Sequence, residues 1–246
     1  MTAVQAKGLT KKYKAKTAVD SLDLTVEEGE LFALLGVNGA GKTTTIRMLT
    51  CLSKPTSGEA YICGHNTVSE SAAVKASVGI SPQDTAVAEN LTVKENLALA
   101  AKVYGFSKEK TAQRIDEMSR LFRLEEVMNS RAKTLSGGWK RKVSIAMALI
   151  SEPRVLFLDE PTLGLDVLAR RELWSAIESL KGKITVILTT HYMEEAEQLS
   201  DRIAIMINGR IQAIGDLQQL EEISGEKGLE NAFVKIAEKA IGGASV

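Results

Sequence analysis

The sequence predicts an α/β fold with a mixed, mostly parallel sheet, an N-terminal antiparallel β subdomain and an inserted α-helical subdomain. Residues 31–35 and 155–158 are short apolar runs without alternation, which is typical of strands buried on both faces of a parallel sheet. Residues 85–152 lie between them and show helical patterns without a strand pattern. Residues 19–26 alternate apolar and polar types, as a half-exposed antiparallel strand does.

The N-terminal segment, residues 1–35, is expected to form short strands that residues 11–14 interrupt. A helix is expected over 44–52, and residues 59–63 read as another strand that Gly64 ends. An antiparallel piece therefore surrounds the start of the parallel core.

Capping residues place the helices of the insertion. Thr92 and Glu95 have the spacing of a capping box and open a helix that Gly105 ends. Ser107 caps a second helix over 108–122, and a third begins near Gly138 and ends before residue 153.

The parallel core resumes at residue 154. Its expected elements are a strand over 155–158, a helix over 167–180, a strand over 184–189, a helix over 193–199, a hairpin over 202–214 with an Asn208-Gly209 turn, and a helix capped by Asp216. We expect a single domain over 1–246. It comprises a parallel core with the antiparallel β subdomain (1–84 and 153–223), a helical subdomain (85–152) and a weakly specified tail (224–246).

The chain is organised around residues 36–43, a Gly-x4-Gly-Lys-Thr pattern between a predicted strand and a predicted helix. This is a P-loop, so the core is that of a P-loop NTPase. Glycines let the backbone wrap a phosphate, whose charge the N–H groups and the helix N-terminus stabilise. Lys42 can reach the β- and γ-phosphates, and the Thr43 hydroxyl can ligate Mg²⁺. ATP and Mg²⁺ are the expected cofactors, and the predicted ATP site includes Gly36, Val37, Asn38, Gly39, Ala40, Gly41, Lys42, Thr43 and Thr44.

Two carboxylates, Asp159 and Glu160, end the strand over 155–158. The carboxyl end of a parallel strand lies at the crevice where such sheets bind ligands. Asp159 is therefore expected to hold Mg²⁺, and Glu160 to act as the base for the attacking water. Without the P-loop, the same pair would be interpreted as an acidic strand end facing solvent.

A second glycine-rich turn, Leu135-Ser136-Gly137-Gly138, precedes a predicted helix. It predicts either a second anion site at a helix N-terminus or a serine cap with a flexible entry. With the P-loop before it and the Asp159-Glu160 strand after it, the chain resembles the nucleotide-binding subunit of an ATP-binding cassette (ABC) transporter.

The resemblance runs from about residue 4 to 223 and assigns further residues. Gln83 matches the Q-loop glutamine, which senses Mg²⁺ and water, and Asp166 matches the D-loop. His191 matches the switch histidine at the γ-phosphate, and Tyr13 matches the aromatic residue that stacks on adenine. The resemblance thus implies catalytic roles for Glu160, His191, Lys42 and Gln83, Mg²⁺ contacts from Thr43, Gln83 and Asp159, and ATP contacts from Tyr13, Ser136, Gly137, Gly138 and Asp166.

The resemblance also implies partners. Two such subunits form a head-to-tail sandwich, with ATP between the P-loop of one and residues 136–138 of the other. A homodimer is favoured, although a heterodimer stays open. The sequence over 90–97 and 165–174 resembles that of the branch that exports drugs, antibiotics or sodium. The chain departs from the family's usual residues at Trp139 and Val167. A membrane-spanning permease on a separate chain is then expected to insert a short helix near 81–96.

Composition limits the alternatives. Lys+Arg and Asp+Glu both number 31, so the net charge of zero argues against a strongly basic nucleic-acid binder, and we expect no nucleic-acid partner. The longest apolar runs, such as 203–207, are far shorter than the ~20 residues of a membrane span, so we expect a cytoplasmic protein attached to the inner face of the cell membrane through its permease. Two other hypotheses are a soluble ABC ATPase acting on ribosomes or nucleic acid, and a catalytically silent binding subunit.

Overall fold

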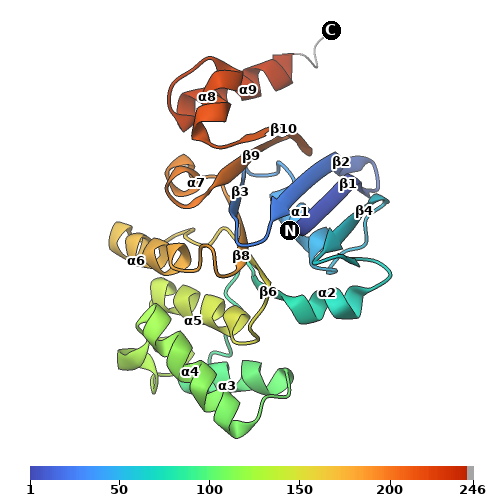
Figure 1. Cartoon of the computed structure of the whole chain (residues 1–246). Coiled ribbons are helices and arrows are strands. Elements are labelled where there is room, and N and C mark those ends of the chain that lie inside the picture. The colour runs from blue at the N-terminus through green and yellow to red at the C-terminus, as the bar shows by residue number, and fades with distance from the viewer. Residues whose placement is uncertain (243–246) are drawn as a thin grey trace.

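The computed structural model describes residues 1–242, whose strands form two sheets (Figure 1). The strands are β1 (Thr2–Tyr13), β2 (Lys16–Glu27), β3 (Leu31–Leu35), β4 (Ser57–Ile62), β5 (His65–Asn66), β6 (Val78–Ser81), β7 (Val155–Asp159), β8 (Thr185–Thr190), β9 (Arg202–Ile207) and β10 (Arg210–Gly215). The helices are α1 (Lys42–Leu49), α2 (Ser71–Ser77), α3 (Val93–Val103), α4 (Lys108–Phe122), α5 (Gly137–Leu149), α6 (Val167–Glu178), α7 (Met193–Leu199), α8 (Leu217–Ser224) and α9 (Leu229–Gly242). Two short 3-10 helices, η1 (Glu125–Val127) and η2 (Ala132–Thr134), lie between α4 and α5.

The larger sheet has the strand order β10-β9-β3-β8-β7-β6. All its neighbours pair in parallel except β10, which is antiparallel to β9. Every residue of β3, β7 and β8 is buried, which explains why these strands read as apolar runs without alternation. The smaller sheet, β2-β1-β4-β5, is antiparallel throughout. The predicted fold class is confirmed.

The larger sheet separates two hydrophobic clusters. On β3, Phe32 and Leu34 belong to the cluster shared with the antiparallel sheet and α1, whereas Leu31, Ala33 and Leu35 belong to the cluster that includes residues of α5, α6 and α7. This is the period of two of a strand covered on both faces. Packing from both sides fixes the end of β3, so the loop that follows starts from a rigid point.

The inserted helices α3, α4 and α5 lie together at one end of the molecule, away from the antiparallel sheet (Figure 1). Thr92 and Glu95 form the predicted capping box, and Ser107 accepts a hydrogen bond from the backbone of Lys110. Helix α4 spans the predicted residues 108–122. The helical character of the insertion matches the sequence prediction; its division from the core at 85 and 152 stays a prediction.

Two elements of the N-terminal third differ from the sequence expectation. Strand β1 continues through Tyr13, and the chain turns at Lys14, whose φ is 50°. The lysines at 11 and 12 do not interrupt the strand because one face of the antiparallel sheet is exposed there. Helix α2 was not predicted; it is short and buries only Val74, so it leaves little apolar periodicity to detect.

The C-terminal segment also differs from the expected weakly specified tail. Residues 229–242 form helix α9, with Leu229, Ala232, Phe233 and Ile236 buried. This spacing, i, i+3, i+4 and i+7, is that of an amphipathic helix. Flanking glycines obscure it in the sequence. Residues 243–246 of that segment lie outside the described residues.

Candidate nucleotide-binding site

The P-loop connects the end of β3 to the start of α1. A Cβ atom at Gly36 would lie 2.4 Å from the Met206 carbonyl oxygen, so no larger residue fits there. Gly41 has a φ of 112°, and a Cβ there would lie 2.5 Å from the carbonyl oxygen of Ala18. Both positions therefore require glycine, one for close packing and one also for its backbone conformation.

Lys42 lies at the centre of this loop and is only 6% exposed. Its Nζ donates to the Gly36 carbonyl oxygen at 2.6 Å and lies 3.1 Å from Glu160 Oε1. The loop's own backbone thus orients the ammonium group, which lies where the start of α1 attracts anions.

Asp159 is the last residue of β7, and its Oδ1 accepts two hydrogen bonds. Thr189 Oγ1 on the neighbouring strand donates at 2.6 Å, and Thr43 Oγ1 on α1 donates at 3.1 Å. The structure therefore brings together the two oxygen groups that the sequence assigns to Mg²⁺. Carboxylate and hydroxyl oxygens are ligands that this hard cation favours.

Glu160 follows Asp159 and is buried between two basic side chains. Its Oε1 faces Lys42, while its Oε2 lies 2.8 Å from His191 Nδ1. Its backbone N–H donates to the Thr189 carbonyl oxygen at 3.1 Å. Glu160 has a φ of 50°, a left-handed conformation that costs of order 1–3 kcal/mol in non-glycine residues and persists only where the surrounding structure holds it.

These groups line a cleft of about 530 Å³. Most of the predicted site residues are there, and the lining consists of Tyr13, Lys16, Ala18, Asn38, Gly39, Ala40, Gly41, Lys42, Thr43, Thr44, Gln83, Glu160, Leu163 and His191. Three further predicted residues adjoin this lining. The carbonyl oxygens of Gly36 and Val37 accept hydrogen bonds from Lys42, and Asp159 accepts one from Thr43. Lys16, Ala18 and Leu163 were not predicted, although Lys16 pairs with Tyr13 across the β1–β2 turn.

Ser136, Gly137, Gly138 and Asp166 do not line this cleft. Ser136 caps α5, and Asp166 caps α6 by accepting hydrogen bonds from two backbone N–H groups. A Cβ at Gly138 would lie 3.2 Å from the Cβ of Ala169, so the two helix N-termini are neighbours. The predicted residues therefore form two separate groups.

Glu195, on α7, is a fully buried carboxyl that the sequence did not indicate. Its Oε1 accepts hydrogen bonds from Thr162 Oγ1 at 2.7 Å and Trp174 Nε1 at 3.0 Å. Burial raises the pKa of Glu195, and the nearby Glu160 carboxylate raises it further. Glu195 thus connects α7, the helix that follows His191, to Thr162 in the loop that follows Glu160.

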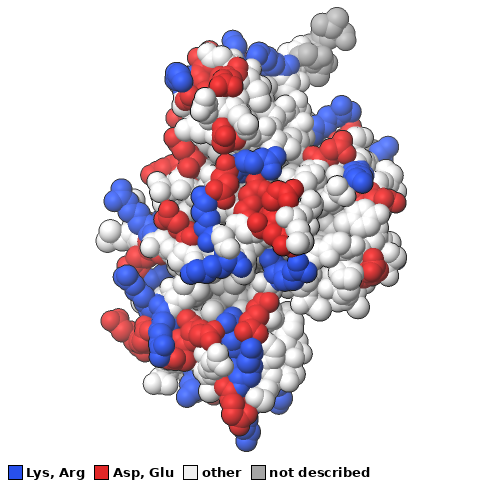
Figure 2. Space-filling view, in the orientation of Figure 1, with Lys and Arg blue, Asp and Glu red and all other residues white. Residues whose placement is uncertain are grey.

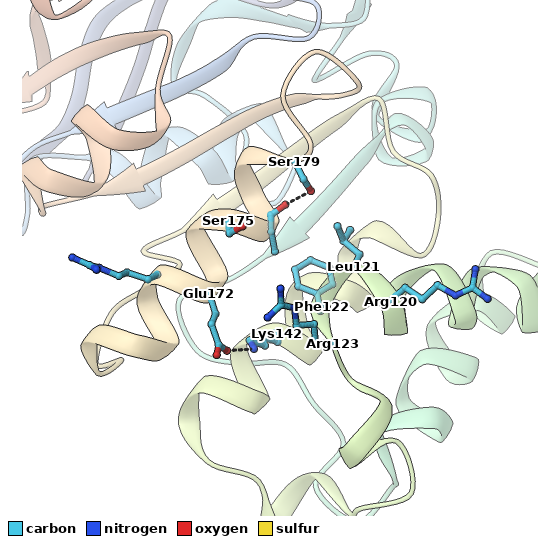
Figure 3. Close-up of a pocket in the computed structure, with 10 residues that line it drawn as sticks. Arg120, Leu121, Phe122, Arg123, Lys142, Glu172, Ser175 and Ser179 are labelled. Carbon is cyan, nitrogen blue, oxygen red and sulfur yellow. Dashed lines mark hydrogen bonds and ion pairs between the residues drawn. The ribbon is translucent and has the colours of Figure 1, made fainter.

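A second cavity, of about 490 Å³, lies where α4, α5 and α6 meet (Figure 3). Glu172 reaches from α6 to Lys142 on α5, with an N–O distance of 2.7 Å. The Lys142 ammonium also lies 4.5 Å from the ring centre of Trp139, one of the two residues at which the sequence departs from the resembled family. This cavity contains none of the predicted site residues.

The fold and the cleft define a P-loop NTPase: a parallel sheet with the loop after β3, a buried lysine and two acids at the end of β7. Comparison with known proteins narrows this class. The ABC transporter family model matches residues 19–163, which is more than half of the chain. The chain belongs to the ABC transporter family and is an ATP-binding, ATPase domain of that family.

Curated relatives include the phospholipid-transporting ATPase ABCA3 of Homo sapiens, 42% identical over 229 residues that cover 92% of this chain and 13% of that protein. The daunorubicin/doxorubicin resistance ATP-binding protein DrrA of Streptomyces peucetius is 41% identical over 224 residues, which cover 91% of this chain and 68% of DrrA. The chain thus spans about an eighth of ABCA3 and two thirds of DrrA.

Solved structures agree with this assignment. An ATP-binding subunit of an ABC transporter superposes with a TM-score of 0.86 at 33% identity, covering 95% of this chain and 99% of its own. A dimer of the ATP-binding cassette MJ0796 bound to ADP and phosphate gives a TM-score of 0.79 at 29% identity and covers 87% of this chain and 98% of its own.

Proposed function

We propose that this chain is the ATP-hydrolysing subunit of an exporter, which works as a dimer around two ATP molecules and drives a separate membrane-spanning permease. The observation that carries the proposal is the meeting of Lys42, Glu160 and His191 at the end of the P-loop cleft. The names of DrrA and ABCA3, which refer to drug resistance and to phospholipid transport, support the export branch.

Thr43, Asp159 and Gln83 are the residues that we propose to hold Mg²⁺. The first two already share a hydrogen bond of 3.1 Å, and Gln83 lines the same cleft. This donor set fits the ion. Bound there, Mg²⁺ neutralises charge on the phosphates of ATP.

Glu160 is proposed to accept the proton of the attacking water. His191 orients the Glu160 carboxylate by contacting its Oε2, which leaves Oε1 as the proton acceptor. Lys42 faces that same oxygen at 3.1 Å. Phosphate oxygens attract the same ammonium, so substrate binding draws Lys42 from Glu160 and frees the carboxylate for the water.

Ser136, Gly137, Gly138 and Asp166 are proposed to serve the nucleotide bound to the other subunit. Their separation from the P-loop cleft supports this arrangement, because one chain then carries two half-sites. Since a single sequence supplies both halves, a homodimer suffices to complete two sites. Tyr13 lies exposed at the cleft and is proposed to stack on the adenine ring.

A groove of about 400 Å³ between the loop after β6 and helix α3 is proposed to receive the permease. Val103 is 76% exposed and Leu52 is 62% exposed along it, an unusual exposure for apolar side chains. The surface on this side of α3, toward α2, is mostly uncharged (Figure 2). No helix among the described residues is long and apolar enough to cross a membrane.

We place the subunit at the cytoplasmic, inner face of the cell membrane, attached through this permease and acting on no nucleic acid. Lys and Arg side chains are interspersed with Asp and Glu on the face seen in Figure 2, rather than gathered into the basic stripe typical of nucleic-acid binders.

Purification of the native protein in detergent tests the proposal. We expect a multi-span membrane protein to copurify with it, and a Leu52→Glu, Val103→Glu double variant to lose that partner while keeping ATP binding. Copurification of ribosomes or nucleic acid would support a soluble ATPase instead and would contradict the transport role.

A further inference from the structure

Arg141 is a buried cation that no step of the proposed mechanism uses. It lies in the second turn of α5, and its side chain is 4% exposed. Among the described residues it forms no ion pair within 4.0 Å. A buried guanidinium stays charged and must be satisfied by hydrogen bonds, so its partners are informative.

Those partners are backbone carbonyl oxygens from both sides of the nucleotide cleft. Nη1 donates to the Pro82 oxygen at 2.6 Å, and Nη2 donates to the Gln83 oxygen at 2.6 Å. Nη2 also donates to the Glu160 oxygen at 3.3 Å. One rigid guanidinium therefore joins helix α5 to the loop of Gln83 and to the residue proposed as the base.

The same loop is fixed at both of its ends by the helical insertion. One turn after Arg141, Ser144 Oγ lies 3.0 Å from Ser81 Oγ at the end of β6. Asn96 on α3 holds the far end, with its side chain bonded to both the N–H and the carbonyl of Ala88. Of the residues that make these contacts, only Arg141 also donates a hydrogen bond to Glu160.

We propose that Arg141 is a positioning residue that keeps the backbones of Gln83 and Glu160 in a fixed relation, so that movement of the helical insertion is transmitted to both. The proposal rests on the proposed role of Glu160 as the base. A planar fork with several N–H donors can bond carbonyls of two segments at once in a fixed geometry, whereas a lysine ammonium is a compact point charge without that fork. Arg141→Lys therefore keeps the charge and removes the connection.

Lys142 provides a matched control because it is the next residue on α5 and is 5% exposed. Its side chain contacts Glu172 on α6 in the cavity of Figure 3 and does not line the nucleotide cleft. Lys142→Met thus removes a buried cation from the same helix turn without touching Gln83 or Glu160.

The experiment compares wild type, Arg141→Lys and Lys142→Met as full chains, well below their melting temperatures. We measure kcat for ATP, affinity for ADP by calorimetry, and hydrogen exchange of the backbone amides over 83–88. For Arg141→Lys we expect kcat to fall about tenfold or more, because small misplacements of catalytic groups are costly. ADP affinity should stay within about twofold, since the P-loop is untouched, and exchange over 83–88 should increase. Lys142→Met should keep kcat within about twofold even if it melts earlier.

If Arg141→Lys had the same kcat as wild type, the proposal would be overturned. A loss of kcat that Lys142→Met shares in proportion to its lowered stability would also overturn it, as would unchanged exchange over 83–88. Either result reduces Arg141 to a structural role. If wild type itself hydrolyses no ATP, the proposed function fails; the exchange measurement still tests the Arg141 contacts.

Discussion

At the scale of single residues, the centre of the cleft is a carboxylate engaged at both oxygens. Glu160 contacts Lys42 through Oε1 and His191 through Oε2. Each partner comes from a different strand end or loop of the larger sheet. The sequence could predict these three because each follows an apolar strand in a recognisable motif.

Arg141, Glu195 and Lys16 could not be predicted in the same way. Arg141 bonds backbone carbonyls, which every residue possesses, so its partners leave no trace in residue types. Glu195 contacts Thr162 and Trp174, whose closeness in space depends on how α7 packs against α6. Such roles follow from tertiary structure alone.

Replacing Lys42 by alanine should weaken ATP binding. The variant loses the buried ammonium at the P-loop, and hydrogen bonds to charged groups contribute about 1.5–3 kcal/mol, so affinity should fall about tenfold to a hundredfold. Calorimetry measures the change. Lys16→Ala, at the rim of the same cleft, serves as the control and should have a smaller effect. Equal ATP affinity in wild type and Lys42→Ala would refute the assignment of the P-loop.

Replacing Glu195 by glutamine should change how stability depends on pH. Burial raises the pKa of this carboxyl above its ordinary value of 4.5, so the folded wild type binds its proton more tightly than the unfolded chain. Its contribution to stability is complete below pH 4.5 and is lost as pH rises through the folded-state pKa. The amide keeps an acceptor for Thr162 and Trp174 and does not titrate.

The glutamine variant should therefore gain stability relative to wild type as pH rises above 4.5, by at most about 1.4 kcal/mol per pH unit. Two charged neighbours affect the pH range over which this stability difference develops. Glu160 raises the pKa of Glu195, and the Arg141 guanidinium interacts electrostatically with the Glu195 carboxyl. Denaturant unfolding of both proteins from pH 4 to 8 measures the difference. A constant difference across that range would show that Glu195 is ionised in the folded protein.

At the scale of elements, helix caps were the most reliable guide. Thr92, Ser107 and Asp216 cap helices as predicted, because their side chains accept hydrogen bonds from the first N–H groups. Helix α2, which was not predicted, lacks such a signal, since Glu70 before it makes no side-chain cap. Local chemistry thus predicts where an element starts, whereas tertiary packing decides whether short segments such as α2 fold.

The N-terminus of α5 carries the next prediction. Ser136→Arg should leave ADP binding by a single subunit unchanged, because Ser136 does not line the P-loop cleft. It should reduce ATP hydrolysis about a hundredfold or more, because a bulky cation there obstructs closure of the two half-sites. Ser136→Ala, which removes the hydroxyl without adding bulk or charge, is the comparison and should reduce hydrolysis less. Loss of nucleotide binding by the Ser136→Arg monomer would contradict the two-half-site arrangement.

At the scale of the whole molecule, the fold class and the order of core and insertion could be predicted because each depends on motifs and apolar periods within one segment. The arrangement of two half-sites on one chain depends on the dimer, which the resemblance implied. The structure supports that arrangement by separating the cleft from residues 136–138.

Glu160→Gln tests this arrangement at the same scale. The amide has nearly the shape of the carboxylate, so the variant should fold and bind ATP, yet it cannot accept the proton of water. It also removes a negative charge next to Lys42 and His191, where the phosphates of ATP are expected to lie. Both changes favour an ATP-bound dimer that does not turn over.

We therefore expect Glu160→Gln to elute as a dimer with Mg-ATP and as a monomer with ADP, while wild type forms only a transient dimer. Hydrolysis should fall about a hundredfold or more, as is usual when a general base is removed. Asp159→Asn is the matched comparison, because it alters the neighbouring acid that contacts Thr43 and should weaken Mg²⁺ binding and the dimer together. If Glu160→Gln kept turnover near that of wild type, Glu160 would not be the base, and His191, which lies 2.8 Å away, would become the group that positions the water.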